Sequence, residues 1–279
     1  MKKRKQIGKI TSYTILILVA IVMLYPLIWM FFASFKNNNE IFQASLFSKV
    51  WTLDGYQNGW QGSGQYTYTT FFKNTFLMVL PMVAFTVISA SFVAFGFARF
   101  KFWGKRIFFA IMLGCMMLPN AVMIIPRYIM FRDLGWLDSY LPFIIPCLFG
   151  GGSFFIFMFI QFFRGIPKEL DESAYVDGCN AFMVYLKIIM PLAKPAIFSA
   201  MIFQFMWSWN DFQSPLLYIS NVKNYPLALG LRMSMDVNMS ISWNNIIAMA
   251  LVSIVPLVVL FFCAQKYFVE GIAATGIKG

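Results

Sequence analysis

Long apolar runs, separated by short polar segments, dominate the pattern along the chain. Each run has roughly 20 residues or more, the length that an α-helix needs to cross about 30 Å of hydrocarbon. The fourth run is interrupted by Pro142, Pro146 and the glycines at 150–152, which favour a broken helix there. The pattern predicts an all-α polytopic membrane protein with six transmembrane helices, at about 13–35, 75–98, 107–130, 140–163, 197–219 and 245–268.

The composition excludes a water-soluble fold. Of the 279 residues, 60% are hydrophobic and 12% are charged, and the mean hydropathy is +0.70. A soluble domain has about a quarter of its residues charged. The basic segment MKKRKQIGKI precedes an apolar run that continues to Phe35. Because a cleaved signal peptide has an apolar core of only roughly 7–15 residues, we expect the first run to remain as a transmembrane helix.

Lysine and arginine indicate the orientation. With a cytoplasmic N-terminus, fifteen of the 22 Lys and Arg residues lie in cytoplasmic segments, in agreement with the positive-inside rule. Both termini are therefore expected in the cytoplasm, in a multi-pass protein of the plasma membrane. The net charge of +11 follows mostly from this topology and needs no nucleic-acid partner.

The sequence offers little for catalysis. It contains no histidine, and none of its four cysteines belongs to a CxxC pair, so no metal site is expected. No paired carboxylates fall within an apolar run, and no GxxxxGK[ST] motif for ATP phosphates occurs. An enzyme is therefore disfavoured, and we expect no cofactor bound by this chain.

The longest charged stretch between two apolar runs is residues 166–195, IPKELDESAYVDGCNAFMVYLKIIMPLAKP. Its acidic residues at 169–172 suit the first turn of a helix, and Gly178 can take the positive φ that ends one. We expect a short helix ending near Gly178 and a second at about 180–189 before the chain returns to the membrane. Because Ala174 and Gly178 are small and four residues apart, we expect them to share a face that a partner protein approaches closely.

The pattern E-S-A-x3-G-x9-I-x-M-P, which starts at Glu172, resembles the EAA loop of ABC importer permeases, E-A-A-x3-G-x9-I-x-L-P. The two departures, Ser173 and Met190, are conservative in size. The resemblance extends over nearly the whole chain: six runs, the loop between the fourth and fifth, and the tail VEGIAATGIKG. The chain is similar to bacterial carbohydrate-importer permeases, in particular to the smaller partner of a heterodimeric pair such as the maltose permeases.

This resemblance implies the transmembrane domain of a type I ABC importer, a single domain over 1–279 with a cytoplasmic coupling loop at 164–196. The chain would be a transport permease, and ATP and Mg would bind to a separate ATPase. The implied partners are a second homologous permease chain in a heterodimer, two cytosolic ATPase subunits, an extracellular solute-binding protein and membrane lipid. Glu172 is expected to pair with a basic group of the ATPase. The residues assigned to ATPase coupling are Glu172, Ser173, Ala174, Asp177, Gly178, Ile188 and Pro191.

The fifth run is unusually polar. In FQFMWSWNDFQSPLLY, residues 203–218, Gln204, Ser208 and Asp211 would share one face of a continuous helix. Asp211 would then lie about 22 Å along that helix, toward the outside, where an acid faces the bundle interior or water. Amides, hydroxyls and aromatic faces suit a sugar, and WNDF is similar to a segment of sugar permeases. The candidate substrate pathway, with interhelical hydrogen bonding as the open alternative, is Gln204, Ser208, Trp209, Asn210, Asp211 and Gln213.

The expected function is ATP-driven uptake of an oligosaccharide, including an acidic one, by alternating access. Arg127 and Arg132, on the outer side, are hypothetical contacts for an anionic sugar. The alternative is a non-sugar solute such as a polyamine or glycerol phosphate. A polyamine is less favoured because Asp211 is the only acid deep in an apolar run. The polar segment at about 36–74 is either a docking surface for an extracellular protein or a solvated loop.

Overall fold

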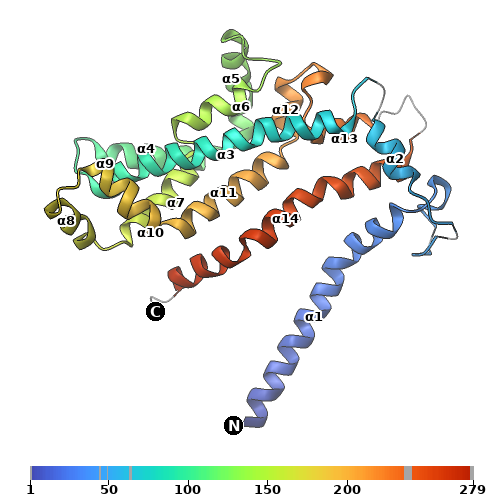
Figure 1. The fold of residues 1–279 in the computed structure, drawn as a ribbon, viewed down its shortest axis with the longest axis horizontal. Helices are drawn as coiled ribbons and strands as arrows, with labels where there is room; N and C mark the ends of the chain where they lie inside the picture. Colours follow the sequence, from blue (N-terminus) through green and yellow to red (C-terminus); the bar gives the residue numbers. More distant parts are fainter. Residues whose placement is uncertain (1, 44, 49, 63–64, 236–240, 277–279) are drawn as a thin grey trace. The chain divides into compact units, whose positions relative to one another are not determined.

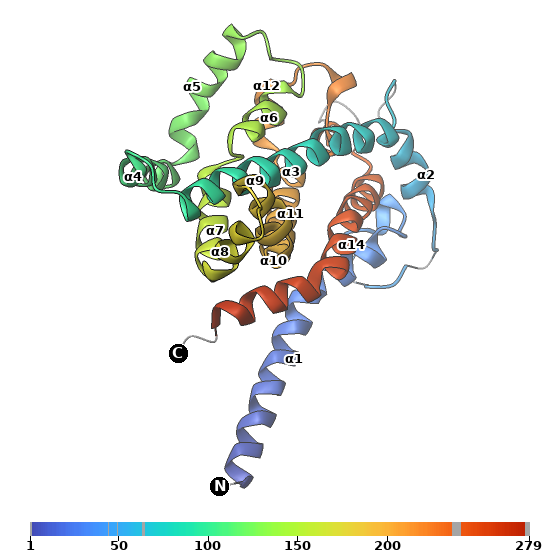
Figure 2. The same ribbon diagram turned by 60° about the vertical axis from the view of Figure 1, so that its left-hand side comes forward.

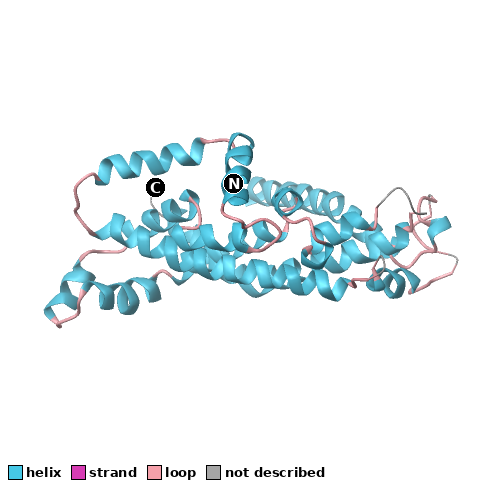
Figure 3. Ribbon diagram, turned by 90° about the horizontal axis from the view of Figure 1, so that it is seen from above, coloured by secondary structure: helices cyan, strands magenta, loops and turns pink. Residues whose placement is uncertain are grey.

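The computed structural model describes residues 2–43, 45–48, 50–62, 65–235 and 241–276, and this part of the chain is helical without a β-strand (Figure 3). Four segments are long and apolar enough to cross a membrane on their own: Lys9–Ala33, Tyr68–Arg99, Leu141–Arg164 and Trp243–Gln265. Two more consist of bent helix pairs, with 102° between Lys105–Met117 and Asn120–Asp133 and 78° between Ala181–Leu192 and Lys194–Trp209. With each bent pair counted as one crossing there are six, so the predicted all-α polytopic architecture is confirmed.

The chain forms two compact units, Met1–Thr70 with Gly230–Val255 and Phe71–Leu229 with Pro256–Gly279. The assignment of residues 1–279 to a single transmembrane domain stays a prediction.

In chain order (Figure 1) the elements are α1 (Lys2–Ala33), η1 (Asn38–Glu40), α2 (Asp54–Gln61), α3 (Tyr68–Arg99), α4 (Lys105–Met117), α5 (Asn120–Asp133), α6 (Leu141–Ile144), η2 (Ile145–Phe149), α7 (Ser153–Arg164), α8 (Glu169–Val176), α9 (Ala181–Val184), η3 (Tyr185–Ile189), α10 (Met190–Leu192), α11 (Lys194–Trp209), α12 (Gln213–Tyr218), η4 (Val222–Asn224), α13 (Leu227–Met233) and α14 (Trp243–Gly276).

In the first unit, the polar segment after α1 is held by specific contacts. The hydroxyls of Ser34 and Tyr56 lie 2.8 Å apart, and the buried Lys36 ammonium donates to the carbonyl of Ser45. Ala33, Ile41 and Ile247 form a small apolar cluster. The described part of the 36–74 segment therefore contains a folded portion with its own helix, α2.

The core of the second unit is built around α7. Its buried residues Phe155, Phe159, Ile160 and Phe163 recur at helical spacing on one face and are 2% exposed or less. They pack in one cluster with small residues of α3 and α11, which run beside α7 (Figures 1 and 2). Small side chains allow helix backbones to approach closely in membranes. The small residues of this cluster are Ala90, Ala94 and Ala98 of α3 and Ala196 and Ala200 of α11.

Two of the predicted helices are not continuous. The third, expected at 107–130, breaks between α4 and α5 at Pro119, which has an extended ψ of 135°. The fifth, expected at 197–219, ends with α11 and resumes as α12 after a break at 210–212. In a continuous helix the ring of Pro215 would clash with the carbonyl of residue 211. The prediction that Asp211 shares a helical face with Gln204 and Ser208 is therefore wrong, and its expected position along that helix does not apply.

The fourth segment is interrupted where its prolines and glycines predicted. The short elements α6 and η2 precede three glycines, Gly150, Gly151 and Gly152, that all have positive φ. Glycine takes such backbone angles at little cost. The helix α7 begins directly after them.

The charged segment at 166–195 also folds as its local signals predicted. The helix α8 ends before Gly178, whose φ is +82°. The second helix is present as α9, the π-helical η3 and α10, and it bends into α11 near Ala193. Figures 1 and 2 show α8, α9 and α10 grouped together at one end of the second unit.

Candidate functional site

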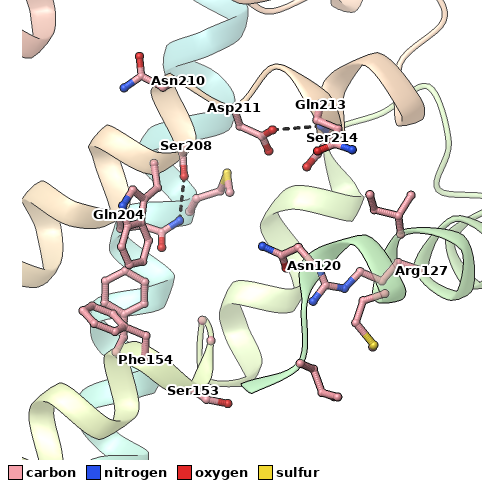
Figure 4. A pocket seen from close by; sticks show the side chains of 18 of the residues that line it. Asn120, Arg127, Ser153, Phe154, Gln204, Ser208, Asn210, Asp211, Gln213 and Ser214 are labelled. Atoms are coloured by element: carbon pink, nitrogen blue, oxygen red, sulfur yellow. Dashed lines mark hydrogen bonds between the residues drawn. The ribbon is translucent and has the colours of Figure 1, made fainter. Parts of the chain in front are cut away.

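A cavity of about 960 Å³ lies within the second unit (Figure 4). Its wall combines carboxamides, hydroxyls, one arginine and one aspartate with methionines and aromatic rings. The polar residues that line it are Asn120, Arg127, Ser153, Gln204, Ser208, Asn210, Asp211, Gln213 and Ser214.

Three helix breaks of this unit border the cavity. Leu118 borders the first break, Gly151 and Gly152 form the second, and Asn210 and Asp211 form the third. Backbone that leaves the helix at membrane depth must have its polar groups satisfied by protein or by water in a cavity. The breaks and the cavity are therefore two aspects of one structural feature.

Five of the six predicted pathway residues line this cavity. Gln204 and Ser208 are buried on α11, and the Gln204 amide donates to the Ser208 hydroxyl at 2.8 Å. In the break after α11, the Asp211 carboxylate accepts from the Ser214 backbone N–H at 3.0 Å (Figure 4). The Asn210 amide donates to the carbonyl of Met206 at 2.8 Å. Gln213 opens α12 and is exposed.

Trp209 is not a cavity residue, contrary to the prediction. It is 5% exposed, its ring stacks on Phe205 at 5.2 Å, and it meets the edge of Phe76 on α3 at 5.1 Å. The tryptophan that faces the cavity is Trp207, which is 51% exposed. Because neighbouring residues on a helix point in different directions, the sequence WSW alone does not decide which indole lines the pathway.

Other residues that line the cavity come from distant parts of the chain and were not predicted from the sequence. Asn120 starts α5, and Ser153 and Phe154 start α7. The only sequence signal for them was their place directly after Pro119 and after the glycines at 150–152. Of the two arginines considered for an anionic sugar, Arg127 lines the cavity, whereas Arg132 pairs with Asp133 at 2.9 Å on an exposed surface.

The charged segment at 166–195 presents most of the predicted coupling residues on its surface. Glu172, Ser173, Asp177, Gly178 and Pro191 are exposed, and Ile188 is half-buried. Apolar side chains accompany them: Tyr175, Val176 and Phe182 are 45%, 88% and 58% exposed. Such an apolar patch on a charged loop is typical of a protein contact surface.

Ala174 departs from this arrangement. It is 5% exposed and packs into the chain's own core cluster with residues of α3 and α7. Gly178 lies beyond the end of α8 with open space around it. The prediction that Ala174 and Gly178 share a face for a partner is therefore wrong, because the helix turns its alanine inward.

A buried ion pair ties α8 to the end of α3. Arg99 Nε lies 2.7 Å from Asp171 Oδ2, and the two side chains are only 4% and 10% exposed. Burial raises the pKa of Asp171 above 3.8, Arg99 opposes this, Glu172 raises the pKa further and Lys168 lowers it. With a raised pKa, the contribution of Asp171 to stability is complete below pH 3.8 and is lost as pH rises through the folded-state pKa. At neutral pH the cost of burying the Asp171 carboxylate is consequently offset by the charge of Arg99.

Comparison with known proteins identifies the family. A family model described as "Binding-protein-dependent transport system inner membrane component" matches residues 87–273. The chain belongs to this family. It is a permease subunit of an ABC importer and a multi-pass protein of the bacterial plasma membrane, not an enzyme. Permeases of this family work with ATPase, further permease and binding-protein components.

Relatives and a solved structure agree with this assignment. The permease is 31% identical to "Probable ABC transporter permease protein YurM" of Bacillus subtilis (strain 168), over 100% of this chain and 91% of that protein. It is 29% identical to the arabinooligosaccharides permease AraQ of the same organism, over 94% and 93% of the two chains. A crystal structure of a bacterial ABC transporter involved in the import of alginate, an acidic polysaccharide, matches 94% of this chain and 97% of its own at 23% identity, with a TM-score of 0.83. This last match shows the same fold.

The two tryptophans of α11 should behave differently when truncated. Trp209→Ala in the permease is expected to lower the free energy of unfolding by about 3–5 kcal/mol, because a buried ring is lost. Trp207→Ala is expected to change it by less than about 1 kcal/mol and to weaken transport, since its ring faces the cavity. Thermal unfolding of the solubilised complex and uptake into vesicles measure the two effects. Equal losses of stability in both variants would contradict the assignment of the two faces.

Proposed function

We propose that this permease takes up an oligosaccharide through the cavity between its broken helices. The observation that carries the proposal is the composition of the cavity wall, where carboxamides and hydroxyls occur together with the exposed aromatic rings of Phe154 and Trp207. Sugar hydroxyls exchange hydrogen bonds with the former, and apolar sugar faces stack on the latter. The size of about 960 Å³ accommodates several sugar rings on the scale of ordinary ligand pockets, about 300–1,000 Å³.

The names of related permeases support a carbohydrate. AraQ is named for arabinooligosaccharides and GanQ of Bacillus subtilis (strain 168), 29% identical over 100% of this chain and 99% of that protein, for galactooligosaccharides. The glycerol phosphate alternative has support from UgpE of Brucella abortus (strain 2308), 27% identical and named for sn-glycerol-3-phosphate. A polyamine is disfavoured because the cavity wall carries one carboxylate and one guanidinium rather than several carboxylates.

We further propose that the sugar is acidic. Arg127 is exposed in the cavity and has no carboxylate within 4.0 Å among the described residues. The only acid of the wall, Asp211, is engaged by the Ser214 N–H at the start of α12. An unpaired guanidinium in a cavity suits a carboxylate of the substrate, which it can bind in bidentate fashion.

Transport would follow from alternating access driven by partner proteins. The exposed Glu172 and the apolar patch around Val176 suit a contact with a cytosolic ATPase. We propose a complex with a second homologous permease chain, two such ATPase subunits that bind ATP and Mg, and an extracellular solute-binding protein. Lipid would cover the exposed apolar side chains of α1.

Stimulation of ATP hydrolysis tests the substrate. The assembled complex in lipid vesicles is supplied with binding proteins loaded with neutral oligosaccharides, acidic oligosaccharides or glycerol phosphate. We expect acidic oligosaccharides to stimulate most strongly. Stimulation by neutral sugars alone would overturn the acidic assignment, and stimulation by glycerol phosphate alone would overturn the carbohydrate assignment.

Arg127→Gln refines this test. The variant is expected to need a roughly ten- to hundredfold higher concentration of the acidic sugar for half-maximal stimulation, because one charged hydrogen-bonding contact of about 1.5–3 kcal/mol is lost. Arg132→Gln is the matched control, since it removes the same charge from an arginine outside the cavity. An equal shift in both variants would indicate a general electrostatic effect and contradict a direct contact by Arg127.

A further inference from the structure

The cytoplasmic end of α3 is anchored to the coupling loop by buried polar contacts. Besides its ion pair with Asp171 on α8, Arg99 donates from Nη2 to the carbonyl of Ile166 at 3.1 Å. One side chain at the end of α3 thus holds both the helix α8 and the turn that leads into it. Both charged side chains are almost completely buried, so this contact is not screened like a surface pair.

A second contact joins α3 to the other half of the loop. The hydroxyl of Tyr185, in the π-helical η3, lies 2.8 Å from that of Ser91 on α3. Ser91 is 0% exposed and Tyr185 is 5% exposed. The Tyr185 ring also packs against Phe92 and Phe95 of α3, with centroids 5.6 and 5.3 Å apart. The loop is therefore attached to α3 at two points, one on each side of Gly178.

The middle of α3 is attached to the wall of the cavity. The Ser89 hydroxyl donates to the carbonyl of Cys147 at 2.6 Å and accepts from the Gly150 N–H at 3.2 Å. The next residue, Gly151, lines the cavity and lies against the buried Thr86 of α3. A single helix therefore contacts the coupling loop at one end and a break in the cavity wall farther along.

We propose that α3 carries movement of the coupling loop to the wall of the cavity, and that Arg99 and Asp171 on one side of Gly178, and Ser91 and Tyr185 on the other, are positioning residues for this step. The proposal builds on the proposed function only in that an ATPase moves the loop. It does not depend on which solute is transported.

The choice of polar residues at these contacts has a physical consequence. Apolar side chains pack in several registers at similar cost, whereas an ion pair with an additional hydrogen bond has one favourable geometry. A rotation of α8 is then transmitted to α3 instead of being absorbed by sliding. Replacing both charged partners by apolar residues should therefore keep the fold and lose the transmission.

The native Cys115 provides a direct readout, because it is exposed and lines the cavity. In a background with the other three cysteines replaced by alanine, the rate of maleimide labelling of Cys115 is measured in the assembled complex with and without ATP. The variants are Arg99→Met, the double variant Arg99→Met/Asp171→Leu and Tyr185→Phe. Arg106→Met is the control, since Arg106 is exposed and forms no ion pair within 4.0 Å in the described part of the chain.

ATP is expected to change the labelling rate in the unmodified background and in the Arg106→Met control. Arg99→Met and the double variant should reduce this change about tenfold, as for a lost coupling between sites, and Tyr185→Phe should reduce it less. Thermal unfolding should show a loss of stability in Arg99→Met that the double variant recovers, because no unpaired charge then stays buried.

A purely structural role for the ion pair gives a different result, since the double variant would then recover stability and ATP response together. That result would overturn the proposal. A labelling rate that ATP leaves unchanged in the unmodified background would also overturn it, because no movement would reach the cavity wall. If no sugar stimulates ATP hydrolysis, the proposed substrate is contradicted. The labelling experiment still tests the role of α3, because it depends on ATP and not on the solute.

Discussion

Gly178→Asp is expected to reduce substrate-stimulated ATP hydrolysis strongly while the complex still assembles. Gly178 has a φ of +82° at the end of α8, where its N–H donates to Tyr175 and the following N–H of Cys179 donates to Ala174. These bonds form the left-handed helix termination that glycine favours. A side chain there costs about 1–3 kcal/mol of backbone strain. The added carboxylate also faces the negative end of the α8 dipole.

The expected loss concerns coupling more than folding, because a Cβ at Gly178 would meet no atom within 4 Å. The strain would be relieved by a change in the angle between α8 and α9, and this changes the surface offered to the ATPase. A cost of 1–3 kcal/mol in a coupled equilibrium corresponds to roughly five- to 150-fold. The ratio of stimulated to basal ATP hydrolysis measures it.

Gly135→Asp is the matched control for this prediction. Gly135 also has a positive φ, +67°, and also has open space around its Cα. It follows α5 in the loop before Trp136, away from the coupling segment. Comparable loss of stimulation in both variants would show that the effect arises from general strain, and the coupling role of Gly178 would be wrong.

Gly151→Ala is expected to destabilise the permease strongly. A Cβ at this position would lie 2.6 Å from Thr86 Oγ1 and 2.7 Å from Thr86 Cβ, and Thr86 is 0% exposed on α3. Gly151 also has a φ of +61°. Strain and overpacking each cost about 1–3 kcal/mol, so we expect a loss of about 2–6 kcal/mol in the free energy of unfolding. Thermal unfolding and the yield of assembled complex are the measurements.

The neighbouring glycine separates the two causes. Gly152 has a φ of +113°, yet a Cβ there would meet nothing within 4 Å. Gly152→Ala should therefore show only the strain, about 1–3 kcal/mol. Thr86→Ala combined with Gly151→Ala should recover part of the difference, because it removes Oγ1 and Cγ2 of Thr86, which both lie in the way, and leaves only its Cβ. If Gly151→Ala and Gly152→Ala unfold at the same temperature, the close approach of Gly151 to α3 is not the determining contact.

Both predictions concern glycines that mark the ends of helices, and these ends have different roles. Gly178 shapes a surface that faces solvent in the isolated chain, so a change there is expected to affect a partner. Gly151 lies where the cavity wall meets α3, so a change there affects the chain's own packing. In the proposed transmission along α3, Gly178 lies near one end and Gly151 near the other.

The sequence by itself determined the features that depend on local chemistry. Apolar runs of membrane-spanning length predicted six crossings, Pro142, Pro146 and the glycines at 150–152 predicted the interruption of the fourth, and Gly178 predicted the end of α8. Each of these follows from the length of a helix or from the backbone angles and hydrogen bonds of a few adjacent residues. The family could be identified for the same reason, because the spacing of the loop motif is a local property.

Only the tertiary structure decided which residues meet. Proline and glycine show where a helix can break, but the direction of the chain after the break depends on the helices packed around it. This is why three breaks converge on one cavity, why Trp207 faces it while Trp209 packs on Phe76, and why Ala174 points inward. Arg99 and Asp171 could not be paired from the sequence, because a buried ion pair between distant segments exists only once packing has excluded water from both.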